Sequence, residues 1–401
     1  MRVCDDITAL RTNLRRMVWP NVTYETLPWH ATTENMSRRA QLRAPRDYES
    51  AIVPHIADAQ FQLRPKTLAA VDRATIAVTR FDAAAVTSTP LLLRGESVAS
   101  SRIEQLSSSS RKIFEAELSG AGSANAKLIV ANVRQMQWAI EVDAATTETL
   151  LAMHSVLLRD SAPGIAGHLR QQAVWIGGPD NHHPGDALFV PPHHEQVPAL
   201  LADLEAFMSR RDVPVLAQAA IAHAQLETIH PFADGNGRTG RALVHVLLKL
   251  RGLSVNGPVP ISAGLLSRVD DYFAALDAYR QGDVDQMVAL FAESAVEAVA
   301  HGTWIADQLD SLLGEWRQQL TARSDALAWK VLPLLLQRPV LTTRIVVDEL
   351  GASVVSAGNA LETLERAGIV AGSQLDKRTR SWRAPDVLEV LDEFADRRRR
   401  V

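Results

Sequence analysis

The sequence contains one cysteine, Cys4, among its 401 residues. A single thiol excludes an internal disulfide framework and suits a reducing compartment. No apolar run approaches the ~20 residues that a membrane-spanning helix needs. The first residues include Asp5 and Asp6 and have no apolar core, so they do not read as a signal peptide. We therefore expect a cytoplasmic protein with no membrane partner.

Charge and composition point to no particular ligand. The formal net charge of −4 gives no general attraction to nucleic acid or acidic lipid. The Gly-x-x-x-x-Gly-Lys-(Ser/Thr) motif is absent, which argues against a P-loop nucleotide-binding protein. A composition of 47% hydrophobic and 22% charged residues is that of an ordinary folded protein, and the length suggests two or three domains.

The most informative stretch is 230–241, which reads His-Pro-Phe-Ala-Asp-Gly-Asn-Gly-Arg-Thr-Gly-Arg. The Ala-rich run 214–229 before it predicts a buried helix. Pro231 disfavours helical geometry at the preceding residue, so we expect His230 where that helix ends. A second predicted helix, 238–251, would direct its N-terminal N–H groups and partial positive charge at the loop between the two helices.

The residue types within this loop suit phosphate chemistry. Gly235 and Gly237 permit close backbone approach, and successive N–H groups there could form a concave anion site. Arg238 and Arg241 lie three apart, so they share a helix face and can both reach phosphate oxygens. Asp234 is the only carboxylate in the loop, and Mg²⁺ takes one or two carboxylates plus substrate oxygens. Any one of these residues alone is more often structural, whereas their combination predicts a nucleotide site with a proton acceptor at its edge.

The stretch resembles the signature of the Fic family, His-Pro-Phe-x-(Asp/Glu)-Gly-Asn-Gly-Arg-x-x-Arg, at every fixed position. This resemblance implies an all-α core that transfers AMP from ATP to a hydroxyl side chain of a target protein. It implies that His230 is the general base and that Asp234 holds Mg²⁺. It places the nucleotide contacts at Phe232, Gly235, Asn236, Gly237, Arg238 and Arg241.

A second stretch offers a competitor for this site. Ser97, Ser100 and Ser101 precede Glu104, and a serine-capped surface helix is the plain interpretation. Beside a Fic signature, however, Ser100-Ser101-Arg102-Ile103-Glu104 resembles the family's inhibitory helix, (Ser/Thr)-x-x-x-Glu followed by Gly or Asn. Gln105 departs from that last position. The resemblance implies that Ser100 and Glu104 are inhibitory, with Glu104 pairing with the guanidinium that receives the γ-phosphate. A reverse role in AMP removal, known in some family members, stays open.

Two β-prone runs predict one hairpin in a helical protein. The first is Val174-Trp175-Ile176, closed by Gly177-Gly178, and the second is 187–192, stopped by prolines. Turn residues lie between them. The hairpin resembles the Fic flap, which would dock an extended target segment through backbone hydrogen bonds, so Val174, Trp175, Ile176 and Gly177 are the predicted docking residues. A zinc site is conceivable, but polar loop histidines are the commoner explanation for those nearby, His182, His183, His193 and His194.

The C-terminal region resembles a winged helix-turn-helix. We expect helices at 327–336, 342–350 and 357–367, with Ser353 or Ser356 starting the third, and strands at 369–371 and 381–384. Such a module suggests DNA. Residues 326–390, however, carry eight Lys/Arg and seven Asp/Glu. This balance favours docking of a protein over binding of DNA.

For the rest of the chain, residues 1–50 are expected to be partly irregular, and 51–86 to be helical with a clear helix at 65–82. Tyr272, Phe273 and Tyr279 could touch the nucleotide base, although packing is favoured. Further predicted helices lie at 127–140, 147–158, 194–210, 268–279, 284–301 and 304–322.

The overall prediction is a mainly α protein with a Fic helical core, one β-hairpin flap and a winged helix. Its domains would be 1–120 (N-terminal helical region), 121–300 (Fic core), 301–325 (linker helix), 326–390 (winged helix) and 391–401 (basic tail). The function hypothesis is a Mg²⁺-dependent protein adenylyltransferase that binds ATP and a target with a Ser, Thr or Tyr hydroxyl. Many relatives form dimers, so a homodimer is allowed. The alternatives are AMP removal or other phosphoryl or nucleotidyl transfer at this site, and a DNA-binding regulator with a nucleotide-sensing core.

Overall fold

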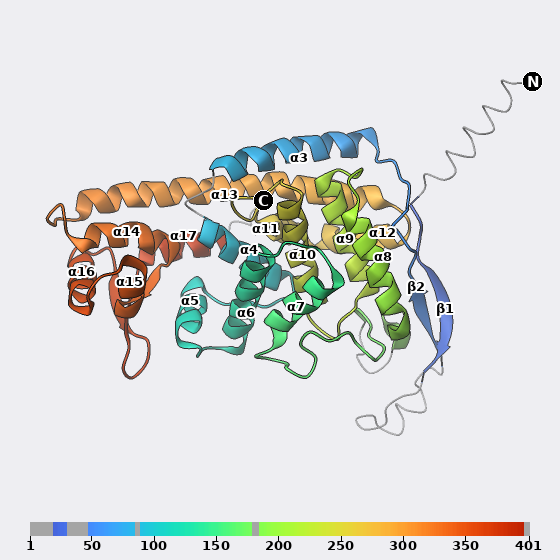
Figure 1. Cartoon of the computed structure of the whole chain (residues 1–401), viewed down its shortest axis with the longest axis horizontal. Helices are drawn as coiled ribbons and strands as arrows, with labels where there is room; N and C mark the ends of the chain where they lie inside the picture. Colours follow the sequence, from blue (N-terminus) through green and yellow to red (C-terminus); the bar gives the residue numbers. More distant parts are fainter. Residues whose placement is uncertain (1–18, 30–46, 85–88, 179–183, 397–401) are drawn as a thin grey trace, which may run out of the picture. The chain divides into compact units, whose positions relative to one another are not determined.

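The structure, a computed structural model, describes residues 19–29, 47–84, 89–178 and 184–396 (Figure 1). The chain divides into two compact units, each built from three separate segments. Unit 1 comprises Met1–Arg73, Glu141–Arg251 and Asp270–Ala292, and unit 2 comprises Ala74–Ile140, Gly252–Val269 and Glu293–Val401. Two of the unit boundaries, 73/74 and 292/293, fall within long helices, α3 (Pro65–Ala84) and α13 (Val284–Gln319).

Helices form most of unit 1, as the sequence predicts. They include α7 (Thr147–Leu158), α8 (Val197–Ser209), α9 (Val215–Ile229), α10 (Asn236–Leu250) and α12 (Val269–Arg280). Helix α9 contacts both α8 and α10, and every residue from Leu216 to Ile229 is buried. Its many alanines allow this burial, because small side chains let neighbouring helices approach closely. α9 is therefore the central support of this unit.

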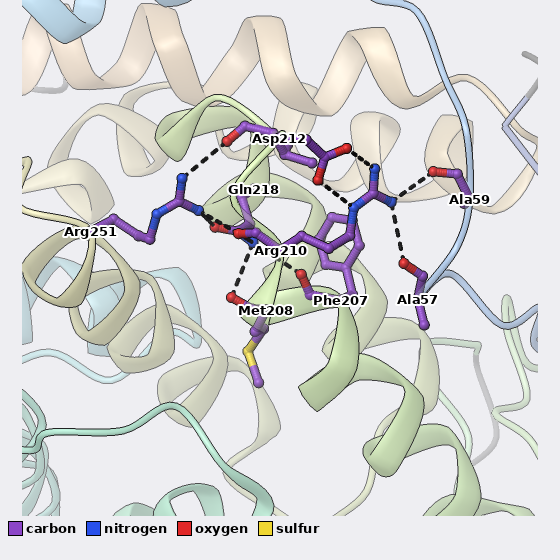
Figure 2. Close-up of polar contacts among 9 residues, drawn as sticks. Ala57, Ala59, Phe207, Met208, Arg210, Asp212, Gln218 and Arg251 are labelled. Carbon is purple, nitrogen blue, oxygen red and sulfur yellow. Dashed lines mark hydrogen bonds and ion pairs between the residues drawn. The ribbon is translucent and has the colours of Figure 1, made fainter.

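The start of α9 is fixed by a group of polar side chains (Figure 2). Gln218 donates from Nε2 to the carbonyls of Phe207 (3.0 Å), Met208 (3.1 Å) and Arg210 (3.0 Å) at the end of α8. Arg251, just after α10, donates to the same Arg210 carbonyl (2.9 Å) and to the Gln218 side chain. These bonds supply donors to carbonyls at the end of α8, where helical N–H donors run out; the Phe207 carbonyl also accepts from Arg210 N (3.1 Å). They tie the end of α8, the start of α9 and the end of α10 together.

The same group reaches the N-terminal segment through the Arg210 side chain. Its Nη1 donates to the carbonyl of Ala59 (2.7 Å), and its Nη2 lies 2.6 Å from the Asp212 carboxylate (Figure 2). The hydrogen bond from Arg210 lowers the pKa of Asp212 to about 2. This arginine is therefore balanced by a carboxylate.

An antiparallel pair of strands in unit 1 was not predicted. Strands β1 (Thr23–Pro28) and β2 (Asp47–Ile52) pair with Thr23 opposite Ile52. The prediction that 51–86 is helical is wrong for its first part, because β2 continues to Ile52 and α3 begins only at Pro65. Apolar residues of a short strand and of a helix start are hard to tell apart by periodicity alone.

The two runs of the predicted hairpin do pair, but over one bridge. Ile176 pairs with Phe189, with Ile176 N donating to the Phe189 carbonyl (2.8 Å). The next residue, Val190, pairs with β2 instead, since its carbonyl accepts from Ala51 N (3.0 Å). Residues 179–183, which hold two of the four histidines, lie outside the described ranges. The segment 189–191 is therefore held between Ile176 on one side and β2 on the other.

Unit 2 contains the predicted inhibitory stretch as part of a longer helix. Helix α4 (Thr89–Ile103) contacts α6 (Ala124–Ala139) and α11 (Ile261–Ser267), and α5 (Ser110–Ser119) also packs on α6. The prediction that serines cap α4 is wrong, because they lie inside the helix. The Ser97 and Ser101 hydroxyls donate to the carbonyls four residues earlier, at 2.9 and 2.8 Å. Local hydrogen bonding of this kind competes with capping and is not visible in the sequence.

The C-terminal elements follow the predicted order, with two additions. They are α14 (Leu327–Gln337), β3 (Val340–Thr342), α15 (Thr343–Leu350), α16 (Val354–Arg366), β4 (Ala371–Gln374), β5 (Arg380–Arg383) and α17 (Pro385–Asp396), and the sheet order is β3-β5-β4. Ser353 caps α16 by accepting from Ser356 N (3.1 Å). Strand β3 and helix α17 were not predicted. The winged-helix assignment stays a prediction supported by this order.

The predicted break between helices 284–301 and 304–322 is absent. Helix α13 continues from Val284 to Gln319, and Thr303 at the predicted break donates its hydroxyl to the Val299 carbonyl within the helix (2.9 Å). Among the described residues, no helix is both long and apolar enough to cross a membrane.

Candidate active site

His230 caps the C-terminus of α9 in a left-handed conformation, with φ 50° and ψ 62°. Its backbone N donates to the Leu226 carbonyl (2.8 Å), which closes the last turn. A left-handed conformation costs a residue other than glycine about 1–2 kcal/mol. Such strain persists only where the surroundings impose it, and it gathers at functional sites.

The imidazole of His230 is in the form that can accept a proton. Its side chain is 19% exposed, and Nδ1 lies 3.7 Å from Oε2 of Glu227. Burial is the main cause that lowers the pKa of His230 to about 3, and the nearby positive charges of Arg170 and Arg280 contribute to this shift. The ring is therefore neutral at physiological pH, as a general base must be.

Asn236 shapes the loop after His230. Its Oδ1 accepts from Phe232 N, and its Nδ2 donates to the Phe232 carbonyl, both at 2.9 Å. The side-chain amide is thus committed to the loop, and what Asn236 can offer a phosphate is its backbone. Gly235 precedes α10 with φ 77°, and a Cβ there would lie 3.0 Å from Leu157. This position therefore needs glycine for both conformation and space.

His154, on α7, is a supporting residue that sequence reasoning missed. Its ring stacks on Phe232 with a centroid distance of 3.8 Å and an interplanar angle of 7°. Gly167 N donates to its Nδ1 (3.0 Å), so Nε2 carries the proton and donates to the Asp234 carbonyl (2.9 Å). Burial lowers the pKa of His154, which keeps this ring neutral. No local motif marks this histidine, since it lies in an apolar helix far along the chain.

Phe232 itself is fully buried. It was predicted among the nucleotide contacts, but in this position its side chain anchors the loop against His154. Tyr272 and Tyr279 likewise pack: the Tyr272 hydroxyl bonds to His223 Nε2, and that of Tyr279 donates to Gln225, both at 2.8 Å. Phe273 is 49% exposed. The favoured packing interpretation thus fits the two tyrosines.

Arg238 and Arg241 are both buried on α10, with 3% and 2% exposure. Arg238 Nη2 lies 3.7 Å from Asp234 Oδ1. Burial lowers the pKa of His223 to about 3, and the charge of Arg241 contributes to this shift. Two buried guanidiniums at the start of a helix make a strongly anion-attracting end, since the helix adds its own partial positive charge there.

Asp234 is the residue that could hold a metal ion. Its carboxylate is 63% exposed, and Oδ1 accepts from Gly235 N (2.6 Å). Within the described ranges no group of three or more His, Cys, Asp or Glu is gathered for a metal. One accessible carboxylate beside a phosphate site is nevertheless what Mg²⁺ uses when substrate oxygens complete its shell, so the residues fit that ion. Zinc, which needs three or four protein ligands, finds no such set there.

The predicted docking residues lie on one short segment. Val174, Trp175 and Ile176 are half-buried and Gly177 is exposed. Trp175 meets Trp29 edge-to-face at 5.6 Å. On the paired segment, the guanidinium of Arg280 lies 3.8 Å from the Phe189 ring centroid. The buried Arg280 of α12 therefore packs against this segment within unit 1.

The predicted inhibitory residues lie in unit 2. Ser100 is fully buried in α4, and Glu104 follows the last residue of that helix, half-buried. Gln105 then adopts a left-handed φ of 62°. This conformation gives a physical reason for the family's Gly or Asn at that place, since both tolerate it better than Gln. Pairing of Glu104 with Arg241, a residue of unit 1, stays a prediction.

Comparisons with known proteins show what the region around this site is similar to. Residues 144–248 match the model of the Fic/DOC family. The chain is 32% identical over 167 residues to protein adenylyltransferase Fic of Aedes aegypti, covering 42% of this chain and 31% of that protein. It is 26% identical over 195 residues to protein adenylyltransferase fic-1 of Caenorhabditis elegans, covering 48% of this chain and 35% of that protein. The chain thus spans about a third of the length of these curated relatives.

A solved structure supports the fold assignment. A Fic family protein from Desulfovibrio desulfuricans superposes with a TM-score of 0.55 at 22% identity, covering 81% of this chain and 97% of that one. At this identity the likeness shows a shared fold.

Proposed function

We propose that the protein, whose residues 144–248 match the Fic/DOC family model, is an adenylyltransferase that moves AMP from ATP to a hydroxyl of a protein target. The observation that carries the proposal is the neutral, strained His230 beside a loop that leads into a helix start with two buried arginines. Curated relatives of the matched region bear the name protein adenylyltransferase.

In this proposal His230 removes a proton, and the phosphate site binds and neutralises the phosphates of ATP. His230 takes the proton from the target hydroxyl, whose oxygen attacks the α-phosphorus of ATP in line. The bond from that phosphorus to the bridging oxygen breaks, and pyrophosphate leaves. Arg238, Arg241 and the N–H groups at the start of α10 offset the charge of the phosphates. Catalysis is then mostly positioning and charge neutralisation, as for phosphoryl transfer in general.

Further parts of the proposal concern ions, inhibition and assembly. Asp234 would hold Mg²⁺, which offsets charge on the phosphates when bound. Glu104 would lower basal transfer by pairing with Arg241. A cytoplasmic location and a homodimer remain parts of the proposal that the single cysteine and the family resemblance support.

The decisive experiment compares three proteins in α-labelled ATP with Mg²⁺: wild type, Glu104→Gly and His230→Ala. We expect weak self-labelling of the wild type, a several-fold rise in Glu104→Gly, and none in His230→Ala, which should still bind ATP in calorimetry. Intact mass should rise by one AMP. Labelling that survives in His230→Ala would refute the base assignment, and a different mass increment would indicate another transferred group. An unchanged rate in Glu104→Gly would remove that residue from the mechanism.

A further inference from the structure

Arg170 is a buried cation that neither the Fic signature nor the proposed chemistry includes. It lies in unit 1, after α7, and is 4% exposed. Burial lowers the pKa of Arg170 to about 10, and no described carboxylate offsets that burial. Removing a charge from water without a counter-ion is costly, so every other contact of this side chain matters.

Backbone carbonyls take the place of the missing carboxylate. Arg170 Nε donates to the His230 carbonyl (2.8 Å), and Nη2 reaches the Ile229 carbonyl (3.4 Å). These carbonyls lie at the C-terminus of α9, where the helix has its partial negative charge and lacks internal donors. Arg170 N also donates to the Pro231 carbonyl (3.0 Å). One residue thus holds the chain on both sides of the strained His230.

The same guanidinium reaches the segment opposite the predicted docking residues. Nη2 donates to the Pro192 carbonyl (2.5 Å), and Nη1 donates to the Gln172 carbonyl (3.0 Å). Pro192 directly follows the segment 189–191 that pairs with Ile176 and β2. Ser50 Oγ adds a second tether there, donating to the Pro191 carbonyl (3.2 Å). The planar guanidinium of Arg170 therefore connects the end of α9 to Pro192, which lies next to the predicted flap (the paired segments 174–177 and 189–191).

We propose that Arg170 is a positioning residue, which sets the place of the target hydroxyl relative to the imidazole by fixing the flap and the backbone of His230 to each other. This rests on the proposed adenylyl transfer. A misplacement of about 1 Å in such a geometry can lower a rate by roughly a hundredfold. Lysine has the charge but not the fork, so it cannot hold carbonyls in both directions at once.

The test compares Arg170→Lys with a matched control, Arg210→Lys, which alters another arginine of unit 1 that binds backbone carbonyls (Figure 2). In Arg170→Lys we expect kcat for transfer to fall about a hundredfold while the Kd for ATP stays within about twofold. Arg210→Lys should retain kcat. Ser50→Ala, which loosens only the flap tether, should lower kcat by a smaller factor, and it serves if Arg170→Lys does not fold.

A second measurement is independent of activity. Hydrogen–deuterium exchange should accelerate in Arg170→Lys in two segments together, 226–233 and 186–193, and in neither of them in Arg210→Lys. Unchanged exchange in either segment, an unchanged kcat, or an equal loss of ATP affinity would overturn the proposal. If the wild type transfers no AMP, the proposed function fails, while the exchange data still decide whether Arg170 couples the two segments.

Discussion

Helix α9 is held by arginines at both ends, and the two ends differ in how the charge is balanced. At its start, Arg210 pairs with Asp212, and Arg251 and Gln218 both donate to the Arg210 carbonyl (Figure 2). At its end, Arg170 meets only carbonyls among the contacts described, beside the strained His230. The first arrangement is typical of a structural clamp. In the second arrangement, backbone carbonyls rather than a carboxylate accept from the guanidinium, beside the proposed base.

The largest expected effect separates stability from activity. Gln218→Ala leaves the Met208 carbonyl without its side-chain donor and Arg251 without its Gln218 acceptor, while the Phe207 and Arg210 carbonyls keep their other donors, and buried polar groups without partners are costly. We expect a loss of about 3 kcal/mol in the free energy of unfolding, measured with urea. The folded fraction should retain its kcat for AMP transfer. A large fall in kcat at low temperature would mean that the start of α9 also positions the site.

A smaller effect tests the strain at helix ends. Within the described residues, His230 and Gln105 are the two non-glycine residues with positive φ. At each position, glycine should give a free energy of unfolding about 1 kcal/mol higher than alanine does, because glycine adopts this conformation without strain. Gln105→Gly should still transfer AMP, whereas His230→Gly should not. Equal stability of the two variants at either position would show that the surroundings do not enforce the conformation.

The smallest effect concerns the carboxylate at the start of α9. The pKa of Asp212 is about 2 in the folded protein, below its ordinary value of 3.8, chiefly through the hydrogen bond from Arg210. Its contribution to stability is therefore complete above about pH 4 and is lost as the pH falls toward 2. Asp212→Asn should be slightly less stable than wild type at pH 6, and the gap should close near pH 2 in urea unfolding. A gap that persists there would exclude the charge as its cause.

The sequence predicted the parts of the site whose signals are local. Pro231, the glycines and the periodicity of the flanking helices are adjacent in the chain, so the end of α9 and the start of α10 followed from them. Arg170 and His154 were missed because their partners lie about 20 to 80 residues away and only the fold brings them together. Strands β1 and β2 were missed for the same reason, since paired residues such as Thr23 and Ile52 lie far apart in the chain.

Other misjudgements came from reading local signals too literally. Serines before an acidic residue suggested a helix start, but in α4 their hydroxyls bond back to carbonyls inside the helix. Separate helices were predicted at 284–301 and 304–322, but α13 runs through 301–304. Such local patterns show which secondary structures a segment can adopt, and tertiary packing selects the one that forms.

Helix α17 changes how the C-terminal region should be studied. Its Ala395 carbonyl accepts from Arg102 of α4 (2.8 Å), and Asp392 accepts from Ser110 N at the start of α5 (2.9 Å). Its Phe394 ring packs so close to Gly95 of α4 that a Cβ added to this glycine would lie 3.1 Å from the ring. Deleting the predicted winged helix together with α17, to ask whether this region binds DNA, would remove the contacts that α17 makes with α4 and α5, next to Glu104. Point changes at Val354 and Val355, which are exposed on α16, ask the question without that side effect.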